Sequence, residues 1–105
     1  MRSVKIMLII HYGIFEFDPK DPIFRDHFPG HPIVPGTLII AAFLKVLQKC
    51  GQCGQTVTLS NFRFIKWVTP GTYRYRIFQR SEHASKIECE LLANDTVLVR
   101  GSILR

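Results

Sequence analysis

The longest unbroken run of hydrophobic residues extends from Leu38 to Leu44, continues as Lys45-Val-Leu-Gln-Lys49 and ends at Cys50-Gly51. Basic residues in a last turn followed by glycine are typical of a helix C-terminus, so this run predicts a helix. Because its first two turns carry no polar side chain, we expect the helix to be buried nearly all round.

The remaining sequence alternates apolar and polar residues or is rich in β-branched and aromatic ones, as strands are. Five such runs are Lys5 to Phe17, Gln55 to Val68, Tyr73 to Arg80, Lys86 to Leu92 and Val97 to Leu104. Turn residues follow the second run, at Thr69-Pro70-Gly71, and the fourth, at Ala93-Asn94-Asp95. Short links favour antiparallel hairpins, so the pattern predicts an α+β fold with one central helix wrapped by a curled antiparallel sheet. We expect a single domain over residues 1–105.

The apolar residues outside the predicted helix bear on association and on membrane contact. Hydrophobic residues make up 47% of the chain, which favours apolar surface for a second copy. The apolar segment Ile6 to Ile10 is far shorter than the ~20 residues of a membrane span, and it lacks the small-residue cleavage site of a signal peptide. We expect it to form the first strand of a cytoplasmic protein with no membrane contact.

Residues 27–36, with the sequence HFPGHPIVPG, contain the candidate chemistry. Two proline-glycine clusters enforce turns, so His27 is expected close to the start of the following helix. A titratable base then lies beside a helix N-terminus, where unpaired amides favour negative charge. The pattern predicts an active-site mouth, although it does not distinguish a packed core from an acyl channel behind it.

The same segment, extended to HFPGHPIVPGTLIIAAF, resembles the signature of the FabZ/FabA family of 3-hydroxyacyl-acyl carrier protein dehydratases. A second segment, residues 61–71 with the sequence NFRFIKWVTPG, is similar to the strand and turn that follow the helix in that family. The resemblance runs from about Ile14 to the C-terminus. It implies the hot-dog fold, normally as a homodimer, and a dehydratase of fatty acid or polyketide-type biosynthesis.

The resemblance also implies residue roles. His27 would be the base that removes the C2 proton, and the amide of Gly36 would polarise the thioester carbonyl. Substrate would be bound by Ile33, whose carbonyl orients the hydroxyl or the histidine, and by Pro35, Thr37 and His31. Neither a metal nor a redox cofactor is implied, because the substrate arrives on the phosphopantetheine of acyl carrier protein.

One position departs from the family pattern. In the family, an acidic residue that protonates the leaving hydroxide lies on the helix five residues after the motif glycine. In this chain, that position is occupied by Ala41. A positioned general acid contributes ~10²–10⁴-fold to the rate, so three alternatives follow. The acid comes from a heterodimer partner with the same fold, or Asp26 or His31 replaces it, or the chain is an acyl-thioesterase or a non-catalytic subunit that binds acyl carrier protein.

Cys50 and Cys53 form a C-x-x-C sequence directly after the predicted helix. A structural zinc site needs four ligands and the chain has no second such pair, while a thioredoxin-type motif opens a helix rather than closing one. We interpret the two cysteines as reduced thiols in a loop.

Fourteen Lys and Arg residues against eight Asp and Glu residues give a net charge of +6. Arg74, Arg76 and Arg80 alternate with tyrosines, which suits either a nucleic-acid face or a solvated side opposite an inward-facing Tyr73, Tyr75 and Ile77. Without a nucleic-acid motif, we favour an acidic acyl carrier protein as partner. A basic rim around the tunnel mouth would attract it, and the candidates are Arg25, Arg63 and Lys66.

Overall fold

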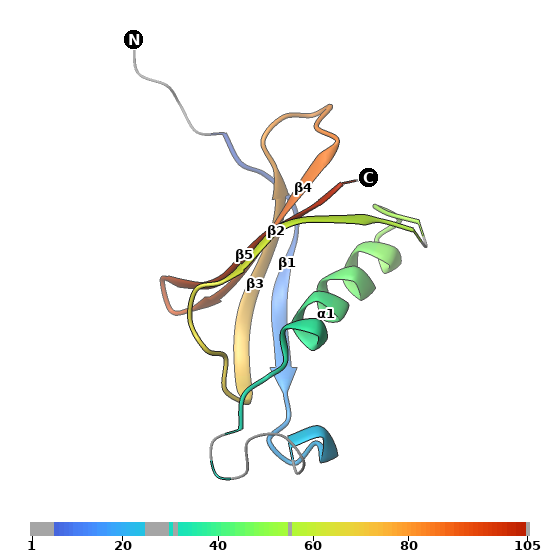
Figure 1. Ribbon diagram of the computed structural model, residues 1–105. Coiled ribbons are helices and arrows are strands. Elements are labelled where there is room, and N and C mark those ends of the chain that lie inside the picture. The colour runs from blue at the N-terminus through green and yellow to red at the C-terminus, as the bar shows by residue number, and fades with distance from the viewer. Residues whose placement is uncertain (1–5, 25–29, 31, 55, 105) are drawn as a thin grey trace.

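The computed structural model describes residues 6–24, 30, 32–54 and 56–104 (Figure 1). One α-helix and five strands make up most of it, with a short 3₁₀ helix, η1, at Pro22–Phe24. The helix is α1 (Gly36–Lys49), and the strands are β1 (Leu8–Phe17), β2 (Thr58–Phe64), β3 (Gly71–Gln79), β4 (Lys86–Ala93) and β5 (Thr96–Leu104). The predicted helix and all five predicted strands are therefore confirmed.

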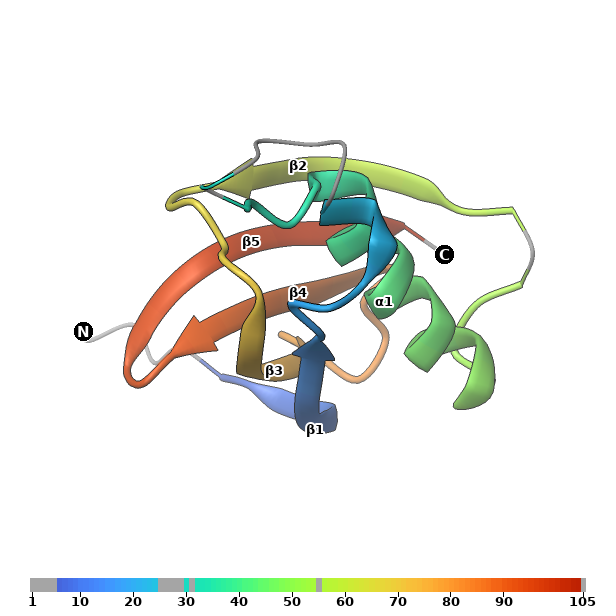
Figure 2. The same ribbon diagram turned by 90° about the horizontal axis from the view of Figure 1, so that it is seen from below.

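The strands form one sheet in the order β1-β3-β4-β5-β2, and every neighbouring pair is antiparallel. The sheet curves, and α1 lies along its inner face (Figures 1 and 2). Strands β1 and β2 are the two edges. This is the α+β arrangement that the sequence predicts.

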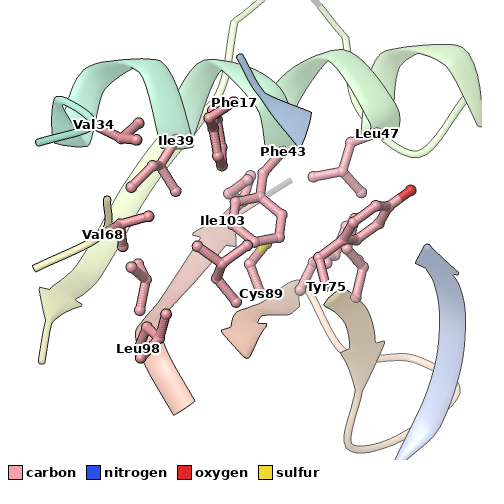
Figure 3. Packing of buried hydrophobic residues seen from close by; sticks show 14 of the residues in the cluster. Phe17, Val34, Ile39, Phe43, Leu47, Val68, Tyr75, Cys89, Leu98 and Ile103 are labelled. Atoms are coloured by element: carbon pink, nitrogen blue, oxygen red, sulfur yellow. The ribbon is translucent and has the colours of Figure 1, made fainter. Parts of the chain in front are cut away.

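The core lies between α1 and the inner face of the sheet (Figure 3). Ile39, Phe43 and Leu47 recur every four residues, so they share one side of the helix, and each is at most 1% exposed. The opposite side is open, because Thr37 and Ala41 are exposed. The expectation of a helix buried nearly all round is wrong, since the sheet of this chain covers only one of its sides.

Strand β2 is shorter than predicted. After Phe64 the chain leaves the regular ladder, because the amides of Ile65 and Lys66 both donate to the carbonyl of Leu98, at 2.8 and 3.2 Å. A bulge also interrupts the β2–β5 pairing between Ser60 and Arg63. At the end of β2, the ring of Phe64 lies against Gly36 at the start of α1.

Side chains along β3 alternate between the two faces of the sheet. Tyr75 and Ile77 are buried in the core, whereas Arg76 and Arg80 pair with carboxylates of β4. This arrangement supports the predicted solvated side opposite inward-facing tyrosines. In the described part of the chain, no helix has the length and apolar character needed to cross a membrane.

Candidate active site

The loop before α1 is fixed to the segment that precedes β3. The amide of Val34 donates to the carbonyl of Val68 at 2.7 Å, and both side chains are almost fully buried. The predicted base His27 lies outside the described residues. So do His31, which was predicted to bind substrate, and Asp26 and Arg25. The described part of the site is therefore residues 32–41 and what packs against them.

The first turn of α1 leaves amides unpaired. The carbonyl of Pro35 accepts from Leu38 and Ile39, at 3.0 and 3.3 Å. Within the described residues, the amides of Gly36 and Thr37 have no acceptor, the helix has no side-chain cap, and its first turn has no acidic residue. Nothing in this part of the chain neutralises the positive end of the helix dipole, so a developing negative charge would be stabilised there.

The ring of Phe64 packs closely against Gly36. A Cβ atom built on Gly36 would lie 2.7 Å from Cζ of the Phe64 ring, far inside van der Waals contact. The ring is 46% exposed and rests against the first turn of α1. The aromatic ring and the unpaired amides therefore border the same space.

That space is a groove of about 690 Å³ with mainly apolar walls. It brings together four residues predicted to form the site, which are Ile33, Pro35, Gly36 and Thr37. The groove is completed by residues that the sequence did not assign to the site, namely Ile23, Val34, Ile39, Ile40, Phe64, Trp67 and Val68. Phe64 and Trp67 belong to the segment NFRFIKWVTPG, so its resemblance to the family was the available signal.

Ala41 lies next to the edge of the groove, one turn after Thr37. Its neighbour Ile40 and the residue one turn earlier, Thr37, both line the groove, whereas Ala41 does not and is exposed, as Lys45 is one turn later. Its methyl group is exposed and has no proton to donate. The site as built by one chain thus has backbone donors and apolar walls, without an acid on the helix.

The predicted basic rim is only partly formed. Lys66 borders the groove. Arg63, in contrast, lies on the outer face of the sheet opposite Arg100 of β5. The alternation of side chains along β2 separates it from Phe64, so Arg63 is not part of a rim around this groove.

Cys50 and Cys53 lie at the other end of α1, and Cys89 lies in β4. Cys50 is exposed at the helix C-terminus, Cys53 is half-buried against the core, and all three cysteines are free. Cys89 is fully buried, and desolvation raises the pKa of its thiol to about 12.

The Tyr75 hydroxyl is 3.0 Å from Nδ1 of His11, and burial raises the pKa of this phenol. Among the described residues, no three His, Cys, Asp or Glu side chains gather as metal ligands would.

Sequence comparison decides the family. A family model described as ApeI-like, ApeI dehydratase, matches residues 11–101. The chain belongs to the ApeI-like dehydratase family. This membership confirms the resemblance to FabZ-like dehydratases that the loop and the segment after the helix carry.

Curated relatives of this ApeI-like protein are called 3-hydroxyacyl-[acyl-carrier-protein] dehydratase FabZ. The protein from Anaplasma phagocytophilum is 29% identical over 81% of this chain and 68% of its own length. That from Wolbachia pipientis is 39% identical over 50% of this chain and 42% of its own length, and that from Rhizobium rhizogenes is 29% identical over 87% and 65%. The chain therefore spans between about two fifths and two thirds of these relatives.

A solved structure has the same fold as this ApeI-like chain. It is a chain of the dehydratase heterocomplex ApeI:P from Xenorhabdus doucetiae, which matches with a TM-score of 0.68 at 23% identity. The match covers 97% of each chain. It confirms the predicted hot-dog fold.

Proposed function

We propose that this chain is a subunit of a dehydratase that eliminates water from a 3-hydroxyacyl thioester carried on acyl carrier protein. The observation that carries the proposal is the pair of unpaired amides, at Gly36 and Thr37, beside an apolar groove of about 690 Å³. A thioester carbonyl bound at these amides would have its acyl chain along the apolar wall. Membership of the ApeI-like dehydratase family supports this chemistry.

In the proposed reaction His27 removes a proton from C2 of the substrate. The negative charge that develops on the thioester oxygen is stabilised by the Gly36 amide and the helix dipole. The C3–oxygen bond then breaks, the hydroxide leaves as water after taking a proton from an acid, and the electron pair forms the C2–C3 double bond. No metal or redox cofactor takes part in this scheme.

The acid is proposed to come from a second hot-dog subunit. Ala41 cannot supply it, and the exposure of this position leaves room for a partner side chain. A structural neighbour that comes from a dehydratase heterocomplex is consistent with a heterodimer. The net charge of +6 favours an acidic carrier protein as the substrate's vehicle.

The test follows enoyl product by mass spectrometry when the purified chain is incubated with 3-hydroxyacyl carrier protein. We expect slow turnover by the wild type and none by His27→Ala. Ala41→Glu is expected to raise the rate by ~10²–10⁴-fold, the typical contribution of a positioned acid. Gln48→Glu is the matched control, because it adds the same charge to an exposed site of α1 farther from the groove.

Three results would contradict the proposal. Equal effects of Ala41→Glu and Gln48→Glu would mean that charge, rather than a positioned acid, changes the rate. An absence of enoyl product from the wild type and from Ala41→Glu, with and without a second hot-dog subunit, would exclude dehydration. Free acid in place of enoyl product would indicate a thioesterase.

A further inference from the structure

A row of charged side chains crosses the outer face of the sheet, away from α1 and the groove. Pairing across the strands aligns Arg63 of β2, Arg100 of β5, Glu90 of β4 and Arg76 of β3. Three arginines therefore accompany a single carboxylate. The charges in this row do not balance, because the carboxylate pairs with only two of the three arginines.

Each oxygen of the Glu90 carboxylate is bound by one arginine. Its Oε1 accepts from Nε of Arg76, and its Oε2 accepts from Nε of Arg100 at 2.9 Å. The carboxylate is 5% exposed, so it has little surface left for another partner. Arg63 has no carboxylate partner in the described part of the chain, and it lies directly opposite Arg100. Like charges directly opposite one another destabilise a strand pair.

A hollow of about 270 Å³ lies beside this pair. Arg80, directly after β3, and Lys86 of β4 also line it, so four cationic side chains border this hollow. The second carboxylate in the hollow, that of Glu88, already accepts from the Ser102 hydroxyl at 2.6 Å and lies 4.0 Å from Nε of Arg80. Lys86, like Arg63, has no ion-pair partner among the residues described.

Part of the hollow is apolar. Phe78 is only 1% exposed, and the Arg80 guanidinium lies 5.4 Å from the centre of its ring. An apolar surface beside the cations lowers the local dielectric constant, which strengthens their attraction for an anion. Asn61 adds a side-chain amide to the lining.

We propose that this hollow binds the phosphate group of a small ligand, either free phosphate or a phosphomonoester. Guanidinium groups present paired N–H donors that match phosphate oxygens, so an anion next to Arg63 and Arg100 would receive charge-assisted hydrogen bonds and relieve their repulsion. The small volume suits one phosphate group rather than an extended polyanion. This site is independent of the dehydration proposed for the groove.

The test titrates the full chain with inorganic phosphate at constant ionic strength, followed by calorimetry and by amide chemical shifts. We expect saturable binding with shifts centred on Arg63 and Arg100. Arg63→Gln should weaken binding by roughly tenfold or more, the loss expected for a charged hydrogen-bond donor. Arg74→Gln is the matched control, because it removes the same charge from an exposed position of β3 outside this hollow. It should change the affinity less than about twofold.

Thermal unfolding keeps the test independent of folding defects in a variant. Phosphate should raise the melting temperature of the wild type and of Arg74→Gln, but not that of Arg63→Gln. The proposal is overturned if binding does not saturate, or if the two variants lose affinity equally. It is also overturned if the protein binds phosphatidylglycerol vesicles through Arg63 but not inorganic phosphate. A phosphomonoester such as glycerol phosphate, compared with free phosphate, distinguishes the two small sources.

Discussion

Substitution of Gly101 by alanine tests how the sheet closes around α1. Gly101 is buried in the interior strand β5, and a Cβ atom there would lie 2.5 Å from Cδ2 of Phe62 and closer still to its Cγ. These atoms form the base of the ring, so rotation of the ring about its own axis does not remove the collision. Either β2 moves away from β5 or Phe62 leaves the inner face.

Both routes have a similar free-energy cost. Overpacking of this kind costs about 1–3 kcal/mol. Loss of a buried phenylalanine costs about 3–5 kcal/mol, and Phe62 is only half-buried, so its eviction costs roughly half of that. We therefore expect Gly101→Ala to lower the free energy of unfolding by about 2 kcal/mol. For a domain of this size the melting temperature would fall by about 8–16 °C.

Chemical denaturation of a double-mutant cycle is the assay. In the Phe62→Ala background the same glycine substitution should cost almost nothing, because the ring that it meets is gone. Gly54→Ala is the control, since a Cβ atom there meets nothing within 4 Å. An equal cost of Gly101→Ala with and without the Phe62 ring would refute the reasoning.

Two further predictions concern the start of α1 and the buried Cys89 of β4. Gly36→Ala should cost at most about 1 kcal/mol of unfolding free energy in denaturation experiments, because it meets the outer atoms of the half-exposed Phe64 ring, which can swing aside. The displaced ring should nevertheless weaken acyl-thioester binding in the groove, and unchanged binding would contradict this. For Cys89, whose folded pKa of about 12 exceeds its ordinary value of 9.0, the unfolded chain loses its proton first as the pH rises. The free energy of unfolding of the wild type should therefore fall relative to that of Cys89→Ala, by up to about 1.4 kcal/mol per pH unit above pH 9. A difference between the two proteins that stays constant with pH would be inconsistent with that pKa.

The fold could be predicted from local patterns because each element has its own signal. Alternation indicated the strands, and the Cys50-Gly51 stop indicated the end of α1. The sequence did not reveal the bulge between Ser60 and Arg63, which depends on how Phe62 meets Gly101 across two strands. For the same reason Arg63 was expected beside the groove, although the pairing of β2 with β5 turns it to the outer face.

Only the part of the site formed by the loop and the start of α1 could be predicted from the sequence. Pro35 and Gly36 set the start of α1 locally, so the groove walls near them followed from the motif. Phe64 and Trp67 come from a segment about 30 residues later, and only tertiary packing brings them to the helix. His27 remains a prediction, because it lies outside the described residues.

The open side of α1 connects the uncovered apolar surface with the missing acid. A run of apolar residues indicates a surface that needs covering, but it does not say whether the cover comes from the same chain. Here the sheet covers Ile39, Phe43 and Leu47, while Ile40 and Leu44 remain half-buried beside the exposed Ala41. Burial of Ile40 and Leu44 by a second subunit would add hydrophobic stabilisation and would bring that subunit to Ala41. We therefore expect a partner that activates the chain to bury this side of α1, and Ala41→Arg should weaken both association and activation.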